Sequence, residues 1–419
     1  MPPAFTFVSR AFIFIDFRAS LWYHNAKSQE DGALEFEVGG RKKARRAYGF
    51  DEVAVVPAAV SIDVADVDTS FNIGDLCFQI PIIASAMDGV VDPRLAVEMG
   101  RLGGLAVLNL EGVQTRYEDP DSVIKQIIEQ DAASVIPFIQ KTYQEPIKPE
   151  LITHRIRQIK DGGQIAAVSA IPAAAKKYAE VIFSAGADIV VIQSTVTTAT
   201  FISSRNESIS ISDFCKTSPV PVIVGNCVSY EGALSLMEAG AGAILSGVGP
   251  GAACTTRRVC GIGVPQITAT ADAAAARDDF YEKTGKYVPV IADGGMRTGG
   301  DIVKAFVAGA DAVMIGSPIA ATEEAPGKGY HWGMATSSAG LPRGTRVHVG
   351  INGTLEELLY GPAKTDNGTM NLVGALRLAM SYCGARTIKD LQKAELVIAP
   401  SLPSEGKTAQ QAQGVGQYR

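Results

Sequence analysis

Short apolar runs alternate with amphipathic stretches along most of the chain, as in proteins whose strands alternate with helices. Eight of these runs have the length of a strand and few polar positions, which is typical of strands buried on both faces of a parallel sheet. They are Ile80–Met87, Gly104–Asn109, Ile165–Ala170, Asp188–Ser194, Pro221–Asn226, Gly242–Val248, Val288–Asp293 and Asp311–Gly316. Eight such strands predict a (β/α)8 TIM barrel in the α/β class. An open α/β sheet stays the alternative, because periodicity alone does not show closure.

The stretches between the strands carry helix signals. Asp92 to Gly103 begins with a candidate N-cap and a proline in the first turn, and it ends with glycine. Tyr230–Ala239 and Gly300–Ala308 each lead through a glycine-containing turn into the next strand, as short connections in α/β proteins do. The pattern supports one catalytic domain built of repeated strand and helix units.

Three segments lie outside this repeat. Residues 1–46 form an N-terminal extension that is rich in aromatic residues and ends in the basic run Arg41–Arg46, and we assign it no role in the fold. Residues 47–397 contain the barrel, with a modest insertion at Gln114–Gly163 between the second and third strands. Residues 398–419 are polar and poor in apolar side chains, so we expect a disordered tail.

Composition excludes several classes of function. The net charge of −6 argues against a nucleic-acid-binding protein, because phosphate affinity depends on clustered lysine and arginine, and the basic run is too short to supply it. No apolar run is long enough to span a bilayer, so we expect no membrane association. The six cysteines form no CxxC pair and the chain has four histidines, which makes a structural zinc site improbable. Widely spaced cysteines suit a reducing compartment, and we expect a cytoplasmic protein.

One stretch, Ile244–Gln266, runs from an apolar strand into a glycine-rich turn that presents Cys254 and two threonines. Gly247, Gly249 and Gly251 permit a tight turn and close approach to a ligand, since glycine takes positive φ without a Cβ penalty. A thiol on such an irregular loop is accessible. The alternative is a buried structural cysteine, which more often lies inside a periodic apolar run.

Active sites of barrels lie at the C-terminal ends of the strands, which selects the residues that follow each run. Glycine turns after strands seven and eight are expected to bind a phosphate through backbone N–H groups. Together with a nucleophilic cysteine they suggest a nucleotide or sugar phosphate as the substrate. Simpler alternatives exist: Asp293 and Ser317 as helix caps, and the Met334 neighbourhood as a surface loop. The candidates are Ser85, Met87, Asp88, Asn109, Gln193, Ser194, Thr195, Gly225, Asn226, Cys254, Asp293, Gly294, Gly295, Gly316 and Ser317.

These residues lie in motifs that resemble the IMP dehydrogenase/GMP reductase family. The motifs are IIASAMDGVVD, PVIVGNCVSYEGALSLMEAGA, GVGPGAACTTRRVCGIGVPQ, VIADGGMRTGGDIVKAFVAGADAVMIGSP and LVGALRLAMSYCGA. The resemblance covers roughly Ala47 to Gln392, and the cysteine loop is its most specific part. Without a regulatory insertion, the chain looks most like the IMP dehydrogenase-related branch of cyanobacteria and actinobacteria, which lacks CBS modules.

The resemblance implies a role for each matching residue. Cys254 would be the nucleophile that attacks C2 of the purine, and Thr256 the hydroxyl that handles a proton there. Asp293 would bind the ribose hydroxyls, while Gly295, Gly316 and Ser317 would hold the phosphate. The purine and ribose pocket would be lined by Ser85, Met87, Asn226, Met334 and Ala335. Gln193, Ser194 and Thr195 would lie beside the nicotinamide cofactor, and the carbonyls of Gly249, Gly251 and Cys254 would correspond to a potassium site. The family implies a homotetramer or octamer.

Departures from the family pattern bear on the reaction. Dehydrogenases of the family usually carry paired CBS modules and a flap with an Arg-Tyr pair that activates water, whereas Gln114–Gly163 is too short for the modules and Met334–Arg343 lacks that pair. Reductases dispense with the flap but pair the threonine with a glutamate, and here Arg343 stands at that position, which leaves Glu356 or Glu357 as substitutes. Ala252 replaces a phosphate-binding serine, His331 replaces a tyrosine and is expected to contact the phosphate, and Gln193 replaces an aspartate.

These departures favour an NADPH-dependent GMP reductase, which converts GMP to IMP and ammonia through a covalent adduct with the cysteine. The alternatives are an IMP dehydrogenase that uses NAD, and a regulator that binds purine nucleotides without turnover. GMP and IMP are the small-molecule partners in each case.

Overall fold

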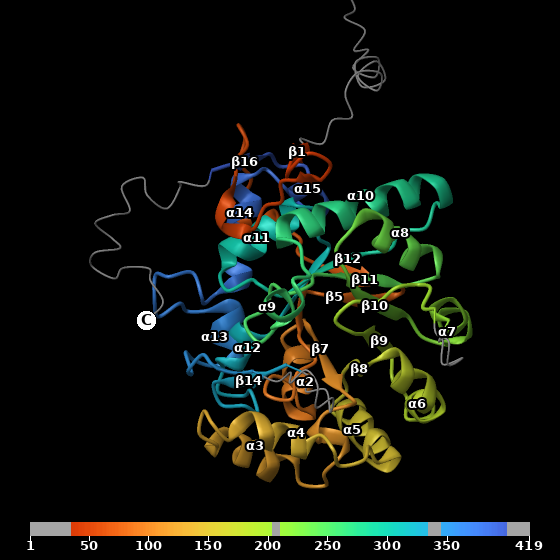
Figure 1. Ribbon diagram of the computed structural model, residues 1–419. Coiled ribbons are helices and arrows are strands. Elements are labelled where there is room, and N and C mark those ends of the chain that lie inside the picture. Colours follow the sequence, from red (N-terminus) through yellow and green to blue (C-terminus); the bar gives the residue numbers. More distant parts are fainter. Residues whose placement is uncertain (1–34, 203–209, 334–344, 400–419) are drawn as a thin grey trace, which may run out of the picture. The chain divides into compact units, whose positions relative to one another are not determined.

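The computed structural model describes residues 35–202, 210–333 and 345–399, and eight parallel strands at its centre close into a barrel (Figure 1). The strands are β6 (Ile82–Ala84), β7 (Leu105–Asn109), β8 (Ala167–Ala170), β9 (Ile189–Gln193), β10 (Val222–Cys227), β11 (Ala243–Ser246), β12 (Val290–Asp293) and β13 (Ala312–Ile315). Neighbours in sequence are neighbours in the barrel, and β13 pairs with β6 to close it. The predicted (β/α)8 barrel is confirmed, and every predicted strand overlaps an observed one.

The strands of the barrel are apolar on both faces. On β7, for example, Leu105 and Val107 point into the barrel, while Ala106 and Leu108 pack outward under the helices. The same alternation recurs around the ring, so one apolar layer fills the barrel and a second joins it to the helices. The apolar interior holds the strand ends in fixed positions.

A hairpin closes the N-terminal end of the barrel. It consists of β4 (Phe71–Ile73) and β5 (Leu76–Phe78), joined by a tight turn in which Gly74 has φ +58°. The rings of Phe71 and Phe78 stack with centroids 5.0 Å apart and belong to the apolar cluster inside the barrel. Ligands therefore reach the barrel from its C-terminal end.

Helices surround the strands. The predicted start at Asp92 is confirmed, because its side chain accepts a hydrogen bond from the N–H of Leu95 at 2.8 Å. After β13 the chain adds helices that pack on α11, and β16 (Leu396–Ile398) pairs with β3 (Val53–Val55). The helices beside the barrel are α2 (Pro93–Arg101), α5 (Pro149–Asp161), α6 (Pro172–Ser184), α7 (Ile211–Thr217), α8 (Tyr230–Glu238), α10 (Gln266–Thr284), α11 (Gly299–Val307), α12 (Ser317–Ala320), α13 (Leu355–Tyr360), α14 (Leu372–Tyr382) and α15 (Ile388–Leu391).

The insertion between β7 and β8 is helical. It holds α3 (Pro120–Glu129) and α4 (Val135–Thr142) ahead of α5, and the apolar piece Ser134–Gln140 supplies the N-cap and the first six residues of α4. The two helices share an apolar cluster with Trp332 of β14 (Tyr330–Trp332), which pairs with β15 (Arg346–His348). Figure 1 shows α3 and α4 beside β14 at one side of the barrel. Helices α3 and α4 thus form a small platform, with its own apolar core, that packs against the β14–β15 hairpin.

The chain divides into two units, residues 1–46 and 47–419. In the first, β1 (Glu35–Glu37) and β2 (Lys43–Arg45) form an antiparallel hairpin, so the middle of the basic run lies on an exposed strand. The expected disordered tail lies outside the described residues, apart from its first two positions. Among the described residues, every helix is too short or too polar to cross a bilayer.

Candidate active site

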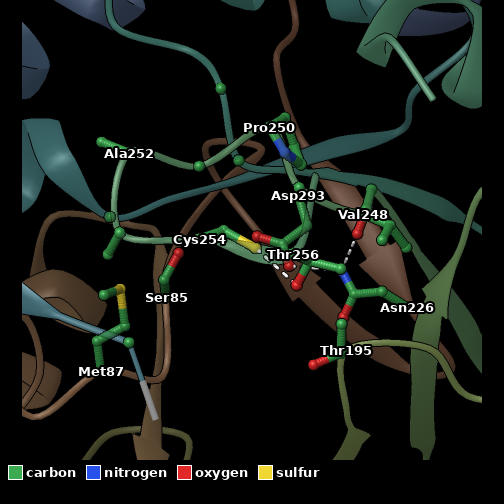
Figure 2. Close-up of a pocket in the computed structure, with 18 of the residues that line it drawn as sticks. Ser85, Met87, Thr195, Asn226, Val248, Pro250, Ala252, Cys254, Thr256 and Asp293 are labelled. Carbon is green, nitrogen blue, oxygen red and sulfur yellow. Dashed lines mark hydrogen bonds between the residues drawn. The ribbon is translucent and has the colours of Figure 1, made fainter. Parts of the chain in front are cut away.

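A cavity of about 630 Å³ opens at the C-terminal ends of the barrel strands (Figure 2). Its size suits a nucleotide-sized ligand. The structure brings most of the predicted site residues into its lining, and only Met334 and Ala335 lie outside the described residues. The predicted residues in the lining are Ser85, Met87, Gln193, Ser194, Thr195, Asn226, Gly249, Gly251, Cys254, Thr256, Asp293, Gly294, Gly295, Gly316, Ser317 and His331.

Cys254 is exposed in this cavity, on the loop that links β11 to the short helix α9 (Thr256–Cys260). Its thiol donates a hydrogen bond to Oγ1 of Thr256 over 3.3 Å, while the threonine itself is buried. Figure 2 shows the sulfur turned toward Thr256, with Ser85 and Asp293 around it in this view. The alternative of a buried structural cysteine is wrong, and the thiol has a hydroxyl beside it for proton transfer.

The loop that carries Cys254 is held from below by Arg257. Nε of Arg257 donates to the carbonyl of Val248 at 3.3 Å, and Nη2 of Arg257 donates to the carbonyl of Val264 at 2.6 Å. Gly249 has φ +83°, and a Cβ placed on it would lie 2.4 Å from Cγ of Arg257. Only glycine permits this approach. Arg257 stood in the cysteine motif without an assigned role, since its spacing alone does not show which backbone carbonyls it reaches.

Asp293, at the end of β12, is held by two amides. Nδ2 of Asn226 donates to Oδ2 of Asp293 at 2.7 Å and to the carbonyl of Gly247 at 2.8 Å. Nε2 of Gln193 donates to the same Oδ2 at 3.0 Å and to Oδ1 of Asn226 at 3.2 Å. The alternative that Asp293 only caps the next helix is wrong, because Thr298 is the N-cap of α11.

Burial raises the pKa of Asp293 to about 6, and the hydrogen bonds from Asn226 and Gln193 act in the opposite direction. The carboxylate is therefore ionised at neutral pH but close to its titration range. As an anion it is an acceptor for hydroxyl groups of a ligand. This agrees with the ribose-binding role that the sequence motif implies.

Backbone turns after β12 and β13 form the part of the cavity suited to a phosphate. Gly295 has φ +84°, and a Cβ there would lie 2.9 Å from Cβ of Pro250, so this turn requires glycine. Ser317 begins α12 but is not its N-cap, which is Gly316. Instead, Oγ of Ser317 lies 2.9 Å from Nε2 of His331. A hydroxyl and backbone N–H groups at a helix start suit an anion.

His331 is buried on β14, with 2% of its surface exposed. Burial lowers the pKa of its imidazole to about 4, so the ring is neutral at pH 7 before a ligand binds. Its Nδ1 has no hydrogen-bond partner among the described residues. The imidazole of His331 thus lies beside Ser317, where the sequence analysis expected a phosphate contact. In the protein without ligand, this imidazole is neutral.

A buried network joins the insertion to the segments that carry Met87 and His331. Asp88, next to Met87, accepts from Tyr143, from the N–H of Val113 at 2.8 Å and from Asn109 at 3.4 Å. Tyr143 also accepts a hydrogen bond from Nε1 of Trp332 at 2.9 Å. Burial raises the pKa of Asp88 from its usual value. Sequence reasoning selected Asp88 and Asn109 but missed Tyr143 and Trp332, which lie far apart in the chain.

Arg346 fixes the other strand of the β14–β15 hairpin to the same platform. Its guanidinium donates to the carbonyls of Ile127 at 2.5 Å, Ile128 at 2.9 Å and Gln130 at 2.8 Å, at the C-terminal end of α3. A cation is favourable at a helix C-terminus, where the carbonyls lack partners. The guanidinium also lies 4.9 Å from the ring centre of Tyr330.

The three residues expected beside the cofactor lie at the end of β9 and directly after it. Gln193 is occupied by Asn226 and Asp293, and Oγ of Ser194 donates to the carbonyl of Val196 at 2.8 Å. The side chains of Gln193 and Ser194 are thus engaged in hydrogen bonds within the protein, on the side of the cavity next to β9. Of the three carbonyls expected to bind potassium, that of Gly251 accepts from the N–H of Cys254 at 3.0 Å. A carbonyl has a second lone pair, so the turn is compatible with a cation.

Glu357 does not replace the missing glutamate partner of Thr256. Its carboxylate accepts from the N–H of Thr354 at 2.9 Å and forms an ion pair with Lys364 at 2.7 Å, so it stabilises the start of α13. Neither Glu356 nor Glu357 lines the cavity, whose one carboxylate among the described residues is Asp293. The prediction that Glu357 takes the role of the missing glutamate is wrong.

Comparisons with known proteins show which family the chain is similar to. A model of the IMP dehydrogenase / GMP reductase domain matches residues 47–406. An uncharacterized oxidoreductase of Mycolicibacterium smegmatis is 38% identical over 371 residues, which cover 86% of this chain and 99% of that protein. The inosine-5'-monophosphate dehydrogenase of Methanocaldococcus jannaschii is 27% identical over 480 residues, covering 85% of this chain and 93% of that enzyme.

Solved structures agree as well. The crystal structure of an IMP dehydrogenase/GMP reductase-like protein from Corynebacterium glutamicum has a TM-score of 0.82 and 35% sequence identity, and the match covers 90% of this chain and 100% of that one. Fold, cysteine loop and sequence similarity lead to one conclusion: this chain is an oxidoreductase-type member of the IMP dehydrogenase/GMP reductase family.

Proposed function

We propose that this protein is a GMP reductase, which converts GMP to IMP and ammonia with NADPH as the reductant. The observation that carries the proposal is the pair formed by Cys254 and Thr256, 3.3 Å apart in a cavity that also contains Asp293 and Ser317. A thiol, a proton-handling hydroxyl, an acceptor for sugar hydroxyls and an anion site on neighbouring strands match the parts of a purine nucleotide.

The chemistry of Cys254 follows from this placement. Its sulfur forms a bond to C2 of the guanine, and the C2–N bond to the exocyclic amino group then breaks, which releases ammonia. Thr256, the hydrogen-bond acceptor of the thiol, is positioned to pass the proton to the departing nitrogen. When the carbon–sulfur bond breaks after reduction at C2, the thiolate is restored. Cysteine suits both steps, because it is a strong nucleophile and leaves readily.

NADPH would supply the hydride that C2 accepts. The wall after β9, with Ser194 and Thr195, is the expected side of approach, since it lines the cavity next to the ribose-binding carboxylate.

The insertion favours reduction over dehydrogenation. Dehydrogenases that the chain resembles usually carry paired CBS modules where this chain has only α3 and α4 ahead of α5. The sequence from Met334 to Arg343 also lacks the Arg-Tyr pair that activates water in those enzymes. A reductase needs no activated water, because ammonia leaves instead.

The alternative function is NAD-dependent oxidation of IMP, which the inosine-5'-monophosphate dehydrogenase relatives support. A regulator that binds purine nucleotides without turnover is the third possibility. Purified protein would be incubated with GMP plus NADPH and with IMP plus NAD, and the nicotinamide absorbance followed. Oxidation of IMP without reduction of GMP contradicts the proposal, and tight nucleotide binding without turnover favours the regulator.

Further properties are proposed with this function. We expect a cytoplasmic homotetramer or octamer, which light scattering of the purified protein would test. We also expect activation by potassium at the carbonyls of Gly249, Gly251 and Cys254, which a comparison of potassium with a bulky organic cation at constant ionic strength would test.

A further inference from the structure

We infer that Gln193 is a positioning residue for Asp293: its amide fixes one carboxylate oxygen and keeps the carboxylate ionised, so that the other oxygen is presented to the hydroxyls of a ribose. The inference rests on the proposed nucleotide site but not on the direction of the reaction. It differs from the role expected from the sequence, in which Gln193 contacts the cofactor.

The hydrogen-bond pattern determines how the amides are oriented. A carboxylate can only accept, so both contacts to Oδ2 of Asp293 must come from N–H groups. Nδ2 of Asn226 makes one of them at 2.7 Å and also donates to the carbonyl of Gly247 at 2.8 Å. Oδ1 of Asn226 is then the acceptor for Nε2 of Gln193, 3.2 Å away. Every contact has one donor and one acceptor.

This pattern treats the two oxygens of Asp293 differently. Oδ2 accepts from Gln193 at 3.0 Å and from Asn226 at 2.7 Å, whereas Oδ1 accepts no hydrogen bond from the described residues. Asp293 lines the cavity and retains partial exposure there. Oδ1 is therefore the oxygen available to a ligand diol, and Gln193 sets its direction from the neighbouring wall of the barrel.

The amide of Gln193 also affects the ionisation of Asp293. The strands around Asp293 present Gln193 on β9, Asn226 on β10 and Met314 on β13, and none of these side chains carries a charge. The other titratable groups that line the cavity are Cys254, Arg297 and His331. The buried carboxylate thus depends on neutral donors to remain ionised, and losing Gln193 removes one of two. An aspartate at position 193 would add a like charge instead.

The test is the pH dependence of nucleotide binding in the Gln193→Met variant, which keeps the length of the side chain and loses the donor. Because the phosphate of GMP titrates near pH 6 as well, each affinity would be divided by that for 2′,3′-dideoxy-GMP, which has the same phosphate and lacks both hydroxyls. The ratio isolates the contribution of the sugar hydroxyls. Isothermal titration calorimetry from pH 5 to 8 would supply both affinities without requiring turnover.

For the wild-type protein we expect the preference for GMP over the dideoxy nucleotide to fall as pH decreases through about 6, where Asp293 takes up a proton. In Gln193→Met the midpoint should move up by about one pH unit, so that the preference at pH 6 is about fivefold smaller. Gln126→Met, the same change on the exposed face of α3, should leave the profile unchanged. Binding of the dideoxy nucleotide at pH 8 confirms that each variant is folded.

The outcomes separate the two proposals. An unchanged midpoint in Gln193→Met, with GMP still bound, overturns the inference and leaves the nucleotide site intact. Failure of the wild-type protein to bind GMP or IMP at pH 8 contradicts the proposed function itself. A preference that is lost equally at every pH would show that Gln193 contacts the sugar directly, which also overturns its role as a positioning residue.

Discussion

Trp332 donates its indole N–H to the hydroxyl of Tyr143 at 2.9 Å, and Tyr143 donates in turn to the buried carboxylate of Asp88. Trp332 follows His331, and Asp88 follows Met87, so one tyrosine of the insertion connects two segments of the cavity wall. Helices α3 and α4 therefore do more than fill a gap between strands. They fix the position of residues that line the cavity.

Replacement of Tyr143 by phenylalanine tests this connection. It leaves the Trp332 N–H without its acceptor and removes a donor from Asp88, and we expect the free energy of unfolding to fall by about 2 kcal/mol. Urea unfolding would measure the change. Tyr281→Phe is the matched control, because Tyr281 is half exposed on α10. Equal stability of the two variants would show that the network contributes nothing.

Asp293→Asn should stabilise the protein without ligand at neutral pH. The folded pKa of about 6 exceeds the usual 3.8, so ionisation of Asp293 opposes folding as pH rises from about 4 to 6 and the loss then stays constant. Asparagine retains a carbonyl oxygen for both amides and avoids that cost. We expect a gain of about 1 kcal/mol above pH 6 and none near pH 4, since partial exposure reduces the effect.

Thermal or urea unfolding at both pH values would measure this difference. A gain of equal size at pH 4 and pH 8 would contradict the assignment of the titration to Asp293. Nucleotide affinity should decrease in the same variant, because a neutral amide replaces the anionic acceptor. Stability and binding thus change in opposite directions.

Cys254→Ala should abolish turnover and leave nucleotide binding measurable, because only the bond-forming sulfur is removed. Cys260→Ala provides the control, since Cys260 is also exposed and is the last residue of α9, the short helix that follows the Cys254 loop. The rate of NADPH oxidation with GMP and calorimetric binding of GMP would be measured for both. Near-full activity of Cys254→Ala would eliminate the covalent mechanism.

Gly249→Ala should destabilise the cysteine loop. Its backbone is left-handed, with φ +83°, and an added Cβ would meet Cγ of Arg257 at 2.4 Å, so we expect a loss of about 2 kcal/mol. Gly251→Ala is the comparison, because a Cβ at Gly251 meets nothing within 4 Å. Unfolding transitions would be compared, and equal effects at both positions would refute the role of Arg257 beneath the loop.

The barrel could be predicted because each strand is a short apolar run with a helix pattern behind it. The position of Cys254 could be predicted for the same reason, since active-site residues follow strands. Tyr143, Trp332 and Arg346 could not, because their partners lie far away in the chain and nothing in local spacing encodes them. The role of Gln193 was also missed: spacing placed it at a strand end, but its partners on two other strands define what it does.

Strands β14 and β15 are paired with Trp332 opposite Arg346, and Arg346 donates hydrogen bonds to the end of α3. Closing a loop whose ends are already adjacent costs little additional entropy for each residue added. In engineering terms, the paired strands β14 and β15 are a fixed attachment point for an inserted segment. A longer flap from a dehydrogenase could be grafted between these two strands, and the direction of the chemistry examined on an otherwise unchanged cavity.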